Sequence, residues 1–198
     1  VSGYGLAAAQ LARLRERGLR LTVCVDKIAA SGGYMMACVA DRIVSAPFAV
    51  LGSIGVVAPL PNAHRLLAEH GIDYQDVTAG KHKRPVSIFG PLTEEGLDKL
   101  KEQLSDTHEQ FKAFVGRYRP GLDIESVATG EHWHGERAKE LGLCDELGTR
   151  DDYLPARSKD ARIIEIQCER PRSIQERAAQ MADAASVLFA RAPSSRSM

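Results

Sequence analysis

The strand-to-helix stretch that decides the fold reads LTVCVDKIAASGGYMMACVA and runs from Leu21 to Ala40. Its first five residues form a short apolar run, which is typical of a strand buried on both faces of a parallel sheet. Ser31 stands at the turn into a helix, where unpaired backbone N–H groups favour a developing oxyanion. A serine there can also serve only as a helix cap, but the two glycines after it suit close approach by backbone or substrate. Ser31 is therefore a candidate nucleophile.

Helix and strand patterns alternate on both sides of this stretch. The spacing of apolar residues predicts helices over residues 4–18, 35–40, 62–70, 93–119, 136–141 and 173–190. Short apolar runs predict strands over residues 21–25, 42–46, 53–58, 74–78 and 162–167. The alternation favours an α/β fold with a mostly parallel sheet, flanking helices and right-handed crossovers. We expect one domain over residues 1–192 and a disordered, Ser-rich tail over residues 193–198.

Composition excludes several classes of function. The 26 basic and 26 acidic residues give no net charge, so a nucleic-acid partner has no electrostatic support from the chain as a whole. No apolar run reaches the length of about 18 residues that a membrane span needs. The four cysteines form no C-x-x-C pair, and we expect neither a metal nor a cofactor. Because the chain begins with Val1 and enters a helix-like stretch at once, we interpret it as lacking an upstream part.

A serine nucleophile needs a base, and the six histidines allow a Ser-His-Asp triad in principle. The A-x-S-x-G pattern around Ser31 resembles the nucleophile elbow of some α/β-hydrolases. Against this, His64, His70 and His108 fall within predicted helices, and the chain is short for that fold. The triad is the less favoured alternative.

A lysine can replace histidine as the base when its amine is neutral, and nearby positive charges disfavour the charged form. Lys83 lies in the basic turn KHKR at residues 81–84. Such a turn is usually just a solvated surface. Lys83 is a candidate base only when it is paired with a nucleophile.

Two further segments are open to both structural and functional interpretations. The small residues of Gly52-Ser53-Ile54-Gly55 could let a substrate backbone pair with a strand edge, or could simply form a tight turn. His132 and His134 are two residues apart and do not share a helix face, so a metal site there is not expected.

Several motifs in order carry a resemblance to a known family. They are DKIAASGGY at 26–34, ADRIVSAP at 40–47, GSIGV at 52–56, TAGKHKR at 78–84, GEHWHGERA at 130–138 and GLCDELG at 142–148. Over about residues 3–148 the chain resembles the signal peptide peptidase A family of serine peptidases, and is most similar to its SohB branch.

The resemblance implies a ClpP/crotonase-like fold and a Ser-Lys dyad. In that family's pattern Ser31 matches the nucleophile and Lys83 the general base, and the backbone N–H of Gly32 is the candidate oxyanion donor. Gly52, Ser53, Ile54 and Gly55 would line the substrate site. The family's second oxyanion donor comes from a segment that would lie upstream of residue 1.

The resemblance also implies a setting for the activity. Proteins of this branch are anchored in the bacterial inner membrane and face the periplasm, so any membrane contact of this chain would come through a missing N-terminal anchor. The family builds ring-like homo-oligomers that bring serine and lysine together across a subunit boundary. The implied substrates are signal peptides or other membrane-associated or periplasmic peptides with small or apolar side chains.

Two alternatives share the fold but not the chemistry. One is a catalytically inactive oligomeric scaffold that binds apolar peptides. The other is a crotonase-type acyl-CoA enzyme, for which the sequence offers no signature of a CoA-binding loop or of catalytic carboxylates.

Overall fold

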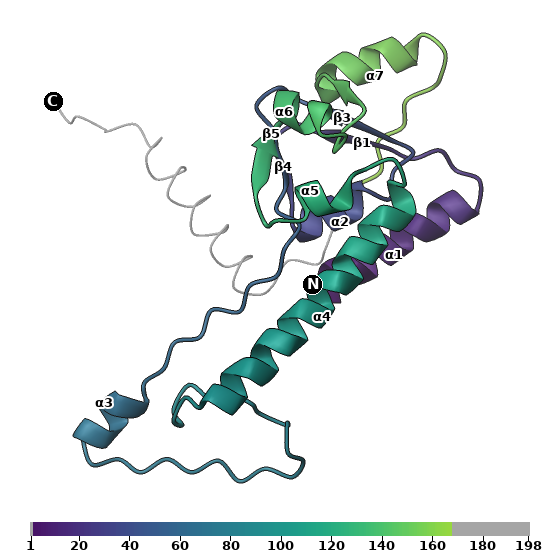
Figure 1. Cartoon of the computed structure of the whole chain (residues 1–198). Coiled ribbons are helices and arrows are strands. Elements are labelled where there is room, and N and C mark those ends of the chain that lie inside the picture. The colour runs from purple at the N-terminus through teal and green to yellow at the C-terminus, as the bar shows by residue number, and fades with distance from the viewer. Residues whose placement is uncertain (1, 168–198) are drawn as a thin grey trace, which may run out of the picture. The chain divides into compact units, whose positions relative to one another are not determined.

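The computed structural model describes residues 2–167 (Figure 1). Two compact units are distinguished, Val1–Lys159 and Asp160–Met198, and they are considered separately. Every helix and strand of the described residues belongs to the first unit, and residues 160–167 form neither. The prediction of a single domain over residues 1–192 stays a prediction. The predicted helix over residues 173–190, the tail over residues 193–198 and Cys168 lie outside the described residues.

The first unit is an α/β structure built on two small sheets. Its strands are β1 (Thr22–Val25), β2 (Ile28–Ala30), β3 (Arg42–Ser45), β4 (Val50–Gly52), β5 (His132–His134) and β6 (Glu146–Leu147). Its helices are α1 (Ser2–Glu16), α2 (Gly32–Ala37), α3 (His64–Glu69), α4 (Glu94–Tyr118), α5 (Ile124–Val127), α6 (Gly135–Glu140) and α7 (Arg150–Ser158). The strand orders are β1-β3-β6 and β2-β4-β5. All pairings are parallel except β4 with β5, so the predicted α/β class and mostly parallel pairing are confirmed.

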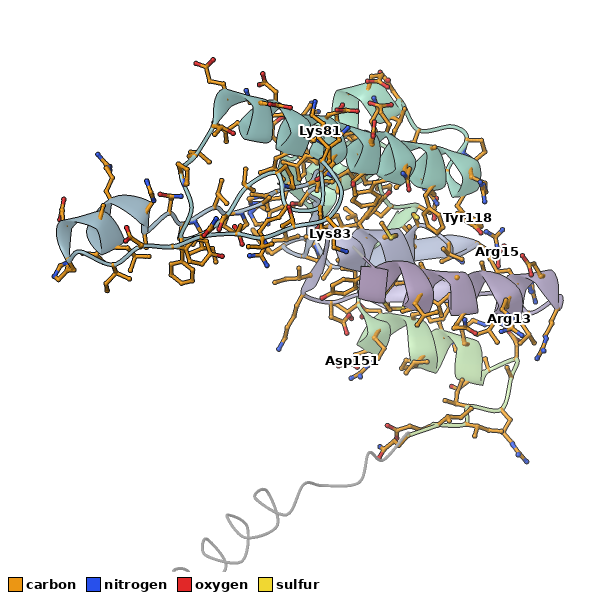
Figure 2. The ribbon with its side chains drawn as sticks, turned by 90° about the horizontal axis from the view of Figure 1, so that it is seen from below. Arg13, Arg15, Lys81, Lys83, Tyr118 and Asp151 are labelled. Carbon is orange, nitrogen blue, oxygen red and sulfur yellow. The ribbon has the colours of Figure 1, made fainter. Side chains whose placement is uncertain are left out.

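The long helix α4 forms where the sequence predicts it. The Thr93 hydroxyl accepts a hydrogen bond from the Gly96 N–H at 3.1 Å, and the acidic residues of the first turn favour the helix dipole. Phe111 and Val115, one turn apart, are buried near the other end. Beyond them, the Arg15 guanidinium of α1 lies 5.9 Å from the centre of the Tyr118 ring (Figure 2). The C-terminal half of α4 is thus the part that packs on the core.

The short helix α2 is the centre of that core. Tyr34 is fully buried, and its hydroxyl donates to the backbone oxygen of Leu143 at 3.0 Å. Small residues of α1 lie against this helix, with Ala8 and Ala12 buried. The Ser31 turn, which immediately precedes α2, is therefore held by some of the most closely packed residues of the unit.

Between β4 and α4 the chain makes a long excursion in which α3 is the only regular element (Figure 1). The strands predicted over residues 53–58 and 74–78 are wrong, because neither segment has a neighbouring strand to pair with. The strand predicted over residues 162–167 is also wrong, because this segment pairs with no strand within residues 2–167. The real strand is β4, three residues earlier than expected, and it ends where Gly52 and Ser53 both adopt a positive φ, of 98° and 50°.

Several short elements were not predicted. They are β2, β5, β6, α5 and α7. Each strand among them is two or three residues long and shows no periodic pattern of its own. No helix within residues 2–167 combines the length and apolar character that crossing a bilayer requires.

Candidate active site

Ser31 occupies an unusual backbone conformation between β2 and α2. Its φ of 52° and ψ of −118° fall in a region that residues with a Cβ rarely enter. Its N–H donates to Gly52 O at 2.8 Å, and its own carbonyl accepts from Met35 N at 3.0 Å. The side chain makes no capping hydrogen bond, so the interpretation of Ser31 as a simple helix cap is wrong. The turn instead presents a half-buried hydroxyl that the helix does not use.

Gly32 must be glycine for a steric reason. A Cβ built on it would lie 2.3 Å from the ring of Tyr4, which therefore covers the start of α2. Because Gly32 is the first residue of this helix, its N–H has no partner within the helix. Gly32 is itself buried and does not line the cleft beside Ser31, so its oxyanion donor role stays a prediction.

The Ser31 turn opens into a cleft of about 400 Å³. Its walls come from four segments of the chain, and the lining residues are Ser31, Ser53, Gly55, Val56, Val57, His108, Thr129 and Gly130. Two residues of the predicted substrate segment, Ser53 and Gly55, are among them. The other two, Gly52 and Ile54, are buried behind this wall. The cleft therefore unites the predicted nucleophile with half of the predicted substrate segment.

Residues in and next to β5 hold the predicted substrate segment, residues 52–55, in place. Ser53 N–H donates to Glu131 O at 2.6 Å, and a Cβ on Gly52 would lie 2.9 Å from the Trp133 ring. The motif around Trp133 thus contributes packing and one backbone acceptor. Among the described residues, no group of three or more His, Cys, Asp or Glu could hold a metal ion.

His108 also lines the cleft, although its place within a predicted helix counted against it as the base of a triad. It lies within α4, as predicted, but it is half-buried and its Nε2 lies 3.1 Å from Ile54 O. The missed signal was its position on the apolar stripe, one turn after Leu104 and one turn before Phe111. A histidine on a stripe that faces the core must have a polar partner there.

Lys83 lies outside this cleft. It is exposed on the turn before α4, where its N–H donates to Gly80 O at 3.1 Å (Figure 2). Its neighbour Lys81 forms an ion pair with Glu95 at 3.1 Å. A single chain therefore does not bring Ser31 and Lys83 to one cleft, and the dyad stays a prediction.

The buried cysteines are not suited to nucleophilic chemistry. Burial raises the pKa of Cys38 to about 12 and that of Cys144 to about 11. Since the thiolate is the reactive form, both side chains are inert near neutral pH. Cys38 is fully buried and is a small core residue, as expected, whereas Cys24 is only half-buried.

Both solved structures and curated sequences resemble this chain. Among solved structures, an enoyl-CoA hydratase/isomerase from Marinobacter aquaeolei has a TM-score of 0.43 and 17% identity, covering 96% of this chain and 57% of that chain. "Probable protease SohB" of Haemophilus influenzae is 50% identical over 94% of this chain and 53% of its own length. A protein of the same name from Buchnera aphidicola is 52% identical over 89% of this chain and 53% of its own length.

The chain thus spans about half the length of the curated relatives it matches. The sequence pattern of Peptidase family S49 matches residues 13–163, which include the Ser31 turn, the excursion and β5. Because this match extends over most of the chain, the protein belongs to peptidase family S49.

Proposed function

We propose that the protein is a serine peptidase whose nucleophile is Ser31 and whose general base is Lys83. The observation that carries the proposal is the position of Ser31. It precedes α2 with a backbone φ of 52°, its side chain makes no capping hydrogen bond, and it lines a cleft of about 400 Å³. Backbone conformations this unfavourable persist where function requires them. Membership of a peptidase family supports the same chemistry.

The reaction is acyl transfer in two stages. The neutral amine of Lys83 removes the proton of the Ser31 hydroxyl, and the oxygen attacks the peptide carbonyl. The Gly32 N–H stabilises the oxyanion that forms, and the leaving amine takes the proton from Lys83. Water then hydrolyses the ester with the same base, which restores Ser31 and releases the acid product.

The base is supplied by a second copy of the chain. Lys83 is exposed on the excursion between β4 and α4, away from the cleft of its own chain. The excursion also exposes large apolar side chains, including Leu66 at 56% and Val77 at 90%. Contact between copies would cover this surface and remove water from Lys83, which disfavours the charged amine. We therefore propose a homo-oligomer with an active site shared between protomers.

The substrates and location follow from the family resemblance. We propose that the protein cleaves signal peptides or other membrane-associated peptides with small or apolar side chains at the periplasmic face of the bacterial inner membrane. An inactive peptide-binding scaffold with the same assembly is the alternative.

Substitutions in the full-length protein test the dyad. We expect Ser31→Ala and Lys83→Ala each to lower peptide hydrolysis about 10³-fold or more, because either change removes the activated nucleophile. Lys81→Ala is the matched control on the same turn and should stay within a few-fold of the wild type. Folding and assembly, followed by circular dichroism and light scattering, should not change.

A fluorophosphonate probe separates the enzyme from the scaffold. The peptidase becomes labelled at Ser31, and Lys83→Ala lowers the labelling rate. Full turnover in either dyad variant, or an unlabelled wild-type oligomer that still binds peptide, would contradict the proposal.

A further inference from the structure

His108 connects the helix α4 to the wall of the Ser31 cleft. Its Nε2 lies 3.1 Å from Ile54 O, and a carbonyl oxygen can only accept a hydrogen bond. Nε2 therefore carries a proton and donates. Both the neutral tautomer protonated at Nε2 and the charged ring supply this proton, so the contact holds in either charge state.

The segment after β4 has a free backbone along the cleft. Among the described residues, the N–H and C=O groups of Gly55, Val56 and Val57 have no hydrogen-bond partner. All three residues line the cleft that contains Ser31. A backbone segment with unused donors and acceptors is a surface to which a peptide can add as a further strand.

The hydrogen bond from His108 to Ile54 O sets the direction of the Gly55 N–H, which is the first free donor of the segment. The peptide bond between Ile54 and Gly55 is trans, so the Ile54 carbonyl and the Gly55 N–H point in opposite directions. Ile54 is anchored, with its side chain fully buried. At Gly55 a Cβ would lie 3.0 Å from Gly130, so glycine lets the backbone lie close to the opposite wall of the cleft. The contact from His108 holds the plane of this peptide bond from its carbonyl side.

We propose that His108 is a positioning residue that holds the Ile54 carbonyl, so that the Gly55 N–H donates to a main-chain carbonyl of a peptide bound beside Ser31. The inference rests on the proposed peptidase function, because it assigns the peptide's place in the same cleft. The ligand is an extended peptide that pairs through its backbone with residues 55–57. His108 acts through Gly55 and takes no proton from Ser31.

Binding measured without catalysis tests the proposal. In the full-length Ser31→Ala protein, the Kd of a short fluorescein-labelled peptide rich in Ala and Val is measured by anisotropy. His108→Leu removes the donor and should weaken binding about 10-fold, the effect of one net hydrogen bond. His108→Gln places an amide N–H where Nε2 stood and should restore the Kd to within about 3-fold.

A matched control is available in His134, whose Nδ1 lies 3.2 Å from Phe48 O and which does not line the cleft. His134→Leu should leave the Kd unchanged. Equal peptide affinity in His108→Leu and the parent would overturn the proposal, as would a loss that His108→Gln does not restore. Absence of any peptide binding by Ser31→Ala would overturn it too.

Peptide hydrolysis by protein that keeps Ser31 distinguishes this inference from the proposed function. His108→Gln should retain hydrolysis, because an amide keeps the contact although it cannot act as a base. His108→Leu should raise the KM about 10-fold and leave the labelling of Ser31 by a small fluorophosphonate unchanged. If the wild type neither hydrolyses peptide nor becomes labelled, the peptidase proposal fails, whereas the affinity differences still decide the role of His108. If His108→Gln binds peptide like the parent but does not hydrolyse it, the imidazole takes part in the chemistry itself and the positioning role is refuted.

Discussion

Replacing Ser31 by glycine should make the protein more stable while it abolishes activity. At a φ of 52° and a ψ of −118° any residue with a Cβ is strained, typically by about 1–3 kcal/mol. Glycine enters this region freely but adds about 0.5–1 kcal/mol of backbone entropy to the unfolded chain. The Ser31 side chain makes no capping bond that would be lost. We therefore expect Ser31→Gly to be about 1 kcal/mol more stable than Ser31→Ala, which lacks the hydroxyl but keeps the strain.

Urea unfolding followed by circular dichroism measures this difference. The midpoint should be higher for Ser31→Gly than for Ser31→Ala at an equal slope, because neither variant changes the area exposed on unfolding. The melting temperature should differ by about 2–4 °C for a chain of this size.

Ser105 provides the control, because it is exposed inside α4 and has an ordinary helical backbone. There the order should reverse, with Ser105→Gly less stable than Ser105→Ala by about 1 kcal/mol. If Ser31→Gly proved equal to Ser31→Ala or weaker, the turn would not be strained, and the argument that function maintains it would fail.

Three further substitutions test how the core supports the site. Tyr34→Phe should cost about 1–3 kcal/mol in urea unfolding, because it leaves the buried carbonyl of Leu143 without its donor; no loss would mean that the hydrogen bond is not formed. Gly135→Ala should lower the free energy of unfolding by about 2 kcal/mol or more, since the new methyl would lie 2.1 Å from the backbone oxygen of Ala46. A urea midpoint equal to that of the wild type would contradict this packing. Burial disfavours the charged form of Asp145, but hydrogen bonds and positive charge, chiefly from Arg119, outweigh it and lower the pKa of this carboxyl below its usual value of about 4. The stability that the carboxylate contributes is therefore fully present above about pH 4 and is lost as the pH falls through the lower pKa of the folded state. The advantage of the wild type over Asp145→Asn should be constant from about pH 5 to 7 and shrink below about pH 4, and an advantage that grew on acidification would refute the sign.

The predicted strand over residues 53–58 shows where local patterns fail. Ile54, Val56 and Val57 have strong strand propensity. A strand forms only where a second backbone supplies hydrogen bonds, and β5 pairs with residues 50–52 instead. The positive φ of Ser53 then turns the chain out of the sheet. Val56 and Val57 then line the cleft with backbone groups that are free within the described residues, whereas Ile54 is buried.

The placement of His108 shows the complementary case. The sequence correctly predicts a helix at this position, because α4 depends on local features such as the Thr93 cap and a regular apolar stripe. It does not predict that the helix packs against the segment after β4, which lies 54 residues earlier in the chain. That contact joins two distant segments, and neither segment's local pattern specifies it.

The sequence by itself determined the α/β class, the helices α1 and α4, the strands β1 and β3, and the serine at the strand-to-helix turn. These features follow from short-range periodicity, capping and steric restrictions, which act between residues near one another in the chain. Only the tertiary structure decided that Ser31 adopts a positive φ, that His108 lines its cleft, and that Lys83 lies outside it. Those outcomes depend on pairing and packing between distant segments, and the sequence pattern of one segment does not identify the segment that it packs against.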